Sequence, residues 1–126
     1  MSEDHSPRNT ILFVEDDAEI GSLFFHVLVE ETPYEVVLAT HPLEALSIVK
    51  DPTPVLFILN YQLPVMDGLH LCDQLHRHRG LEDIPTLMIS ATLPEQKELD
   101  RRGIIALEKP VDLDTFLATV HTLIEQ

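Results

Sequence analysis

Basic residues are scarce in this chain of 126 residues, and so is cysteine. Eight lysines and arginines stand against 22 aspartates and glutamates, which gives a formal net charge of −14 at pH 7 with histidine neutral. A protein that binds a nucleic-acid backbone or an anionic membrane surface by charge needs a basic face. The charge balance therefore argues against direct binding of this chain to nucleic acid or to a membrane.

The single cysteine, Cys72, excludes a disulfide bond within the chain, fits the reducing cytoplasm and is expected in the core. No apolar run approaches the roughly 20 residues that a membrane-spanning helix needs. The first residues are polar and acidic, unlike a secretory signal peptide, and residues 1–9 are expected to form a disordered tail. A hydrophobic content of 44% is enough for one buried domain, which we expect over residues 10–126.

Short apolar runs alternate with segments in which apolar residues recur at helical spacing. Strands are expected at about 10–15, 35–39, 55–59, 85–90 and 104–107. Near-continuous apolar strands are typical of a parallel sheet that is covered on both faces. Strand–helix units joined by right-handed crossovers predict an α/β fold, a doubly wound (βα)5 flavodoxin-like three-layer sandwich with strand order 2-1-3-4-5.

The apolar stripes of the expected helices indicate which residues face the sheet. A short charged helix is expected after Pro94, and Asp112 is expected to cap the last helix. The stripes are Ile20, Leu23, Phe24, Val27 and Leu28 in the first helix, Leu43, Leu46 and Val49 in the second, Leu69, Cys72 and Leu75 in the third, and Leu113, Phe116, Leu117, Val120 and Ile124 in the last.

Polar residues follow four of the five expected strands, at the edge where ligands bind in sheets of this kind. They are Glu15, Asp16, Asn60, Ser90 and Lys109. Two acids, a hydroxyl and a lysine suit a divalent cation and a phosphoryl group. A carboxylate nucleophile would complete such a site, but the central strand ends in an amide.

Four short motifs contain these polar residues or lie beside them. They are Val14-Glu15-Asp16-Asp17, Leu63-Pro64-Val65-Met66-Asp67-Gly68-Leu69, Ile89-Ser90-Ala91 and Glu108-Lys109-Pro110. In this order and at this spacing, they resemble the receiver domain of two-component response regulators, of the single-domain chemotaxis-regulator type. The resemblance extends from Ile11 to the last helix, and it implies a role in phosphorelay signal transduction.

The resemblance also implies a role for each polar residue. Glu15 and Asp16 match the acid pair that holds Mg²⁺, with the backbone carbonyl of Gln62 as a further ligand. Ser90 matches the hydroxyl that contacts the phosphoryl group. Lys109 matches the lysine that pairs with acceptor and phosphoryl oxygens as a compact point charge.

Two positions depart from the family pattern. Asn60 stands where the family has its phosphoacceptor aspartate, and an amide cannot form the mixed anhydride that a carboxylate forms. Ala106 stands where the family has an aromatic switch residue. We therefore expect a pseudo-receiver that acts by protein–protein interaction, without phosphorylation or enzymatic activity. Mg²⁺ binding should be weak or vestigial, and Lys109 should lean toward Glu15 or Asp16.

Two other functions stay open at this point. One is a conventional Mg²⁺-dependent phosphoacceptor receiver whose native residue 60 is Asp, with self-phosphorylation as its only catalysis. The other is a nucleotide- or flavin-binding protein of the flavodoxin type. The acids Glu15 and Asp16 disfavour the latter, because a phosphate-binding turn favours glycine, serine or threonine.

A pseudo-receiver would bind a histidine kinase, a phosphotransfer protein, another receiver or an output domain. The expected interaction surface consists of the fourth helix, fifth strand and fifth helix, or of the first helix. Its candidate residues are Phe25, Val29, Ala106 and Pro110. Phe25 and Val29 lie beside the apolar stripe of the first helix, so the alternative is that they widen the core face.

Other polar residues have simpler structural interpretations. Asp17 is expected to cap a helix, because a negative side chain is favourable at a helix N-terminus. Asp67 is expected to serve in a turn or a cap, in preference to replacing the missing acceptor. His70, His76 and His78 lack the one-face spacing of a metal site and are expected to be solvated surface residues.

Overall fold

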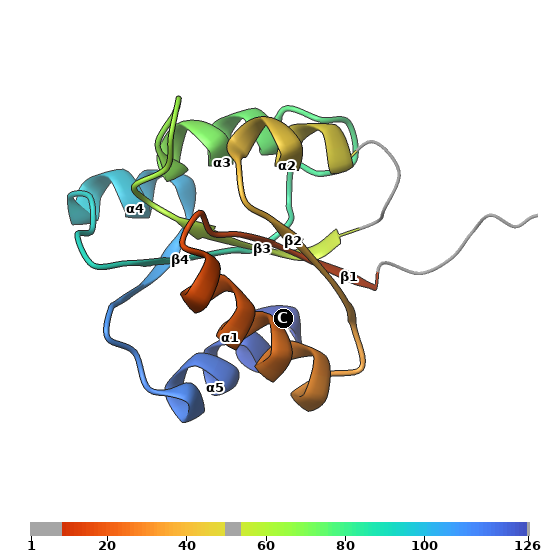
Figure 1. The fold of residues 1–126 in the computed structure, drawn as a ribbon. Coiled ribbons are helices and arrows are strands. Elements are labelled where there is room, and N and C mark those ends of the chain that lie inside the picture. Colours follow the sequence, from red (N-terminus) through yellow and green to blue (C-terminus); the bar gives the residue numbers. More distant parts are fainter. Residues whose placement is uncertain (1–8, 50–53, 126) are drawn as a thin grey trace, which may run out of the picture.

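The computed structural model describes residues 9–49 and 54–125, which form a five-stranded parallel sheet with helices on both faces (Figure 1). The strand order is β2-β1-β3-β4-β5, as predicted. The strands are β1 (Thr10–Val14), β2 (Glu35–Ala39), β3 (Pro54–Asn60), β4 (Thr86–Ser90) and β5 (Ile105–Glu108). Residues 1–8 of the expected N-terminal tail lie outside the described residues.

Two helical layers enclose the sheet. α1 (Ala18–Glu31) and α5 (Leu113–Ile124) cover one face, and α2 (Pro42–Ile48), α3 (Gly68–His76) and α4 (Gln96–Arg102) lie on the other (Figure 1). No helix in the described part of the chain has the length and apolar character to cross a membrane.

Each face of the sheet has its own hydrophobic core. β1 and β4 are buried at every position, as their continuous apolar sequences predict, whereas the edge strand β5 is only partly buried. On the α1 and α5 side, Phe24 stacks on Phe116 with ring centroids 4.7 Å apart. On the other side, Phe57 and Leu71 belong to the cluster that joins β3 to α3. The prediction of a three-layer α/β sandwich is confirmed.

Aspartate caps begin three of the helices. The side chains of Asp17, Asp67 and Asp112 each accept hydrogen bonds from backbone N–H groups in the first turn of α1, α3 and α5. A cap of this kind stabilises a helix by about 1 kcal/mol, because it satisfies a donor that has no partner within the helix. The capping predictions for these three residues are confirmed.

The predicted apolar stripes were too wide in three helices. The side chains of Leu23 and Leu43 are 54% and 55% exposed, and Leu113 is also exposed. α1 buries only Gly21, Phe24 and Leu28, and Leu23 is rotated about 100° from Phe24 on the helix. A helix that packs on a sheet buries a narrower face than its apolar pattern indicates.

Gly68 fixes the distance between the end of β3 and the start of α3. A Cβ atom at this position would overlap the carbonyl oxygen of Asn60 and lie 2.8 Å from Met88 Cε. The Gly68 backbone N–H also donates to the Tyr61 carbonyl at 2.7 Å. The close approach therefore requires glycine, and it holds the strand end firmly against the helix.

Gly68→Ala is expected to destabilise the fold by about 1–3 kcal/mol, because β3 and α3 must separate to admit the methyl group. Chemical denaturation measures this loss. Gly21→Ala is the matched control, since its Cβ would lie at an ordinary 3.4 Å from Leu38. Alanine also stabilises a helix interior relative to glycine by about 0.5–1 kcal/mol. Equal stability of the two variants would contradict this account.

Candidate functional site

The polar residues predicted at the strand ends come together at the carboxyl edge of the sheet. Glu15 and Asp16 follow β1, Asn60 ends β3, Ser90 ends β4, and Lys109 follows β5. The Lys109 backbone N–H donates to the Ser90 carbonyl at 2.9 Å, which extends the pairing of β4 and β5 to the site. Glu15, Asn60 and Ser90 are buried, so most of the site lies below the molecular surface.

The Asn60 side chain lies at the centre of this group. Its Nδ2 atom donates to the Gln62 carbonyl at 2.9 Å, and lies 3.3 Å from Asp16 Oδ1 and 3.4 Å from Glu15 Oε2. All three acceptors are the atoms that the family resemblance assigns to Mg²⁺. The amide nitrogen therefore points into the space between the expected cation ligands.

The second Glu15 oxygen is paired with Lys109. Lys109 Nζ lies 2.9 Å from Glu15 Oε1, and the two side chains are 17% and 2% exposed. Glu15 Oε2 also accepts from the Asp17 backbone N–H at 3.1 Å. A buried carboxylate needs such partners, because removal of a charge from water is costly. The prediction that Lys109 leans toward Glu15 is confirmed.

The oxygen of the same amide has no partner. Within the described residues, Asn60 Oδ1 is the buried side-chain oxygen or nitrogen atom that lacks a hydrogen bond, although the residue is only 7% exposed. An unpaired buried acceptor costs about 1–3 kcal/mol. The amide cannot gain by simply exchanging its two ends, because its oxygen would then face three other oxygens.

The donor set suits a hard divalent cation by its chemistry. Glu15, Asp16 and the Gln62 carbonyl supply only oxygen atoms, which Mg²⁺ and Ca²⁺ prefer. No group of three or more His, Cys, Asp or Glu side chains that could hold a metal ion occurs in the described ranges. The site therefore has two carboxylates and one carbonyl, and the Asn60 side chain lies beside all three.

The four candidate interaction residues divide between the two alternative surfaces, with Phe25 and Val29 on α1, Ala106 on β5 and Pro110 just after β5. Phe25 packs partly against the core on the α1 and α5 side, and Ala106 packs against the core on the opposite side of the sheet. Val29 is exposed on α1, and Pro110 is exposed beside Lys109. The sheet separates Phe25 from Ala106, so a single flat partner cannot cover both.

An apolar hollow that the sequence analysis missed lies next to Lys109. It has a volume of about 480 Å³ and lies between α1 and the segment that joins β5 to α5. Its apolar lining includes Ile20, Leu23, Phe24, Pro110 and Leu113. Leu23 and Leu113, two of the exposed leucines at the margins of the predicted helix stripes, therefore line a common hollow.

The fold and the edge geometry agree with the comparison to protein families. The family model of the response regulator receiver domain matches residues 11–121. The chain belongs to this receiver-domain family. The match runs from Ile11 in β1 into α5, so it covers the complete set of strand ends that form the site.

Curated relatives include receivers of different overall length. This receiver domain is 30% identical over 119 residues to the DNA-binding dual master transcriptional regulator RpaA of Synechocystis sp., a match that covers 92% of this chain and 49% of RpaA. It is 28% identical over 116 residues to the polar-differentiation response regulator DivK of Brucella anthropi, covering 90% of this chain and 94% of DivK. The chain thus spans about half the length of RpaA.

A solved structure shows the same fold. The Vibrio cholerae chemotaxis protein CheY4 superposes with a TM-score of 0.83 at 25% sequence identity, and the match covers 93% of this chain and 99% of that one. The predicted family, fold and strand order are therefore confirmed together.

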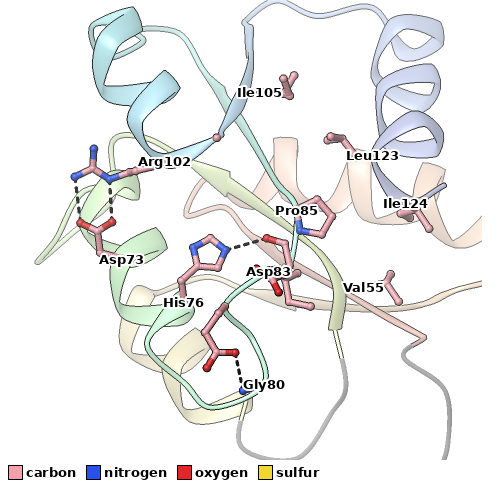
Figure 2. Close-up of a pocket in the computed structure, with 13 residues that line it drawn as sticks. Val55, Asp73, His76, Gly80, Asp83, Pro85, Arg102, Ile105, Leu123 and Ile124 are labelled. Atoms are coloured by element: carbon pink, nitrogen blue, oxygen red, sulfur yellow. Dashed lines mark hydrogen bonds and ion pairs between the residues drawn. The ribbon is translucent and has the colours of Figure 1, made fainter. Parts of the chain in front are cut away.

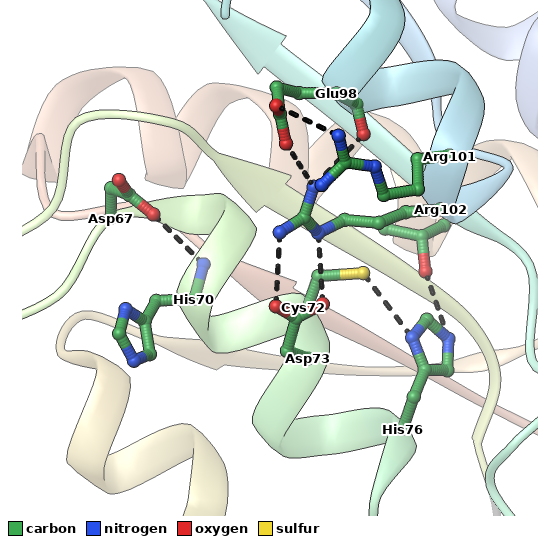
Figure 3. A network of polar contacts seen from close by, with 9 residues as sticks. Asp67, His70, Cys72, Asp73, His76, Glu98, Arg101 and Arg102 are labelled. Atoms are coloured by element: carbon green, nitrogen blue, oxygen red, sulfur yellow. Dashed lines mark hydrogen bonds and ion pairs between the residues drawn. The ribbon is translucent and has the colours of Figure 1, made fainter.

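A network of ion pairs and hydrogen bonds between α3 and α4 fixes the position of α4. Arg102 reaches from α4 to α3, where its Nε and Nη2 atoms donate to the two carboxylate oxygens of Asp73 at 2.9 and 3.1 Å (Figure 3). Its Nη1 atom donates to Glu98 Oε1 at 2.9 Å. The hydrogen bonds that Arg102 donates to Asp73 and Glu98 raise the pKa of the Arg102 guanidinium, and the bond from Arg102 lowers the pKa of Glu98.

His76 is not the solvated residue that we expected. It is half-buried, with Nε2 2.9 Å from the Ile84 carbonyl and Nδ1 3.3 Å from Cys72 Sγ (Figures 2 and 3). Since a carbonyl only accepts, Nε2 donates to Ile84, which leaves Nδ1 for the contact with the Cys72 thiol. The i, i+4 spacing of Cys72 and His76 on α3 was the signal for this contact. His70 is exposed, as predicted.

A larger hollow, of about 990 Å³, lies at the opposite edge of the sheet from Asn60 (Figure 2). Its lining includes Val55 and Ile105 at the starts of β3 and β5, together with His76 and Arg102. The hollow therefore contains none of the expected phosphoryl or metal residues.

Asp73→Asn is expected to lower the free energy of unfolding by about 0.5–1 kcal/mol, because it removes the bidentate ion pair with Arg102, which is only partly exposed. Chemical denaturation at low and high salt measures this loss, which high salt should reduce. Arg101→Gln is the control, since Arg101 is exposed and pairs with Glu98 at 3.5 Å. If Arg101→Gln lowers the free energy of unfolding as much as Asp73→Asn does, the Arg102–Asp73 ion pair has no specific role in holding α4 against α3.

Cys72 should resist thiol reagents in the folded protein. Burial raises the pKa of its thiol to about 11, so at pH 8 only about one molecule in a thousand carries the reactive thiolate. Mass spectrometry after iodoacetamide treatment should show no adduct at pH 8 and a single adduct in denaturant. Rapid labelling of the folded protein at pH 8 would show that the thiol is accessible and acidic.

Proposed function

We propose that this receiver domain signals without phosphorylation, by presenting a fixed protein-interaction surface. The observation that carries the proposal is the Asn60 amide at the end of β3, the position that the family resemblance assigns to the phosphoacceptor aspartate. A neutral amide is a poor nucleophile toward a phosphoryl donor. The amide nitrogen is also hydrogen-bonded to Gln62, Asp16 and Glu15.

The residues next to Asn60 in the chain do not replace the missing carboxylate. Leu59 and Tyr61 flank Asn60 and have no carboxylate. Asp67 lies in the loop that follows, but its side chain accepts from the His70 backbone N–H at 2.8 Å as the cap of α3. Glu15 is occupied by Lys109. The local hydrogen bonds thus support a receiver without an acceptor.

Two features support a fixed surface. Ala106, which the resemblance places at the aromatic switch position, is too small to move between buried and exposed states. The Arg102–Asp73 pair holds α4 against α3 through contacts that do not involve the strand-end site. α4, β5 and α5 would therefore present one arrangement to a partner.

The proposed partners are a histidine kinase, a phosphotransfer protein, another receiver or an output domain. The name of RpaA describes a DNA-binding transcriptional regulator, of which this chain spans about half the length. With a formal net charge of −14, this domain would reach nucleic acid only through such a partner. The exposed leucines beside Pro110 add a candidate contact on the α1 side.

Intact mass spectrometry tests the central claim. After incubation with Mg²⁺ and acetyl phosphate, the chain should show no phosphoryl adduct, whereas Asn60→Asp should gain one because a carboxylate nucleophile is restored. An adduct on the unchanged protein would refute the proposal. Asp67→Asn would then show whether the α3 cap had served as the acceptor.

A further inference from the structure

The two terminal atoms of the buried Asn60 side chain differ in their hydrogen bonding. Its nitrogen has three acceptors within 3.4 Å, and its oxygen has no hydrogen-bond partner in the described part of the chain. A primary amide is nearly symmetrical in shape, and the terminal torsion of asparagine has two broadly equivalent positions. Rotation by half a turn exchanges the two ends without displacing the backbone.

The rotated amide would create a different site. Its oxygen would replace the nitrogen among Glu15 Oε2, Asp16 Oδ1 and the Gln62 carbonyl oxygen. Four oxygens would then converge on one point, two of them from carboxylates. Such an arrangement is repulsive when empty and favourable around a hard divalent cation, for which an asparagine carbonyl is an ordinary ligand.

We propose that the Asn60 amide is a two-position gate for a divalent cation. With no cation bound, the nitrogen faces the acids and satisfies them. With a cation bound, the amide is rotated and its oxygen is a metal ligand. The inference deepens the proposed function, because it gives a receiver that is not phosphorylated a way to respond to a small ion at the same edge.

The ion pair of Lys109 is compatible with both positions. Lys109 bonds Glu15 Oε1, whereas the amide nitrogen faces Oε2 of the same carboxylate. Rotation of the amide therefore leaves Lys109 in place, and the cation gains only part of the negative charge of Glu15. The affinity should be lower than that of Asn60→Asp, which offers a third carboxylate.

A crystal structure with Mn²⁺, located by its anomalous scattering, tests the gate directly. The gate predicts a metal ion about 2.1 Å from a terminal atom of the Asn60 side chain, and only the amide oxygen can bind at that distance. A metal held by Glu15, Asp16 and Gln62 with both amide atoms beyond 3 Å would refute it, as would an empty site at saturating Mn²⁺.

Titration of the ¹⁵N-labelled protein with Mg²⁺ gives an independent readout in solution. The Asn60 side-chain amide resonances should shift and saturate. Asp16→Asn should weaken the response roughly tenfold or more, because it removes an exposed charged ligand. Asp17→Asn is the matched control, because it also removes one negative charge next to the site. The Asp17 side chain accepts hydrogen bonds from the α1 backbone, and asparagine can cap a helix in the same manner.

The two variants and the phosphorylation assay give distinct results. A response that Asp16→Asn and Asp17→Asn weaken equally would mean diffuse attraction to an acidic surface, and would overturn the gate. A phosphoryl adduct on the unchanged chain would overturn the proposed function and leave the metal geometry to be judged by the crystal structure alone.

Discussion

The hydrogen bonds of the Asn60 amide nitrogen connect segments that are far apart in the sequence. Asn60 is 44 residues from Asp16 and 45 from Glu15, and Glu15 is in turn paired with Lys109, 94 residues away. One side chain at the end of β3 thus joins the loops that follow β1 and β3, and Glu15 adds the loop after β5. Gly68 permits this by letting α3 begin directly against the Asn60 carbonyl. The geometry of the whole carboxyl edge depends on these contacts.

The buried charge of Glu15 is compensated by neighbouring protein groups. Glu15 is almost fully buried, and it is compensated by the Lys109 ammonium, the Asp17 backbone N–H and the amide of Asn60. A carboxylate in place of this amide would bring three negative groups together beside one lysine, and such a group is costly without a cation. The amide removes that requirement, and the unsatisfied Asn60 oxygen is the remaining cost.

The sequence predicted the sheet and the convergence of the site well, because both depend on strong and local patterns. Continuous apolar runs specify strands that are buried on both faces, and parallel strands bring their carboxyl ends to one edge whatever the loops between them. The widths of the buried helix faces were not predictable in this way. Leu23 and Leu43 fit a helical stripe, but burial also depends on the angle at which each helix crosses the sheet. His76 was misjudged for a similar reason, since its carbonyl partner, Ile84, lies in the loop after α3.

α4 shows how the position of one helix can be decided away from the strand-end site. With only seven residues, α4 is too short to be stable by itself, so tertiary contacts determine where it lies. Those contacts are the buried Leu99 and the Arg102–Asp73 ion pair with α3. The close contact of Gly68 with the end of β3 likewise fixes the start of α3, the helix to which α4 is bound.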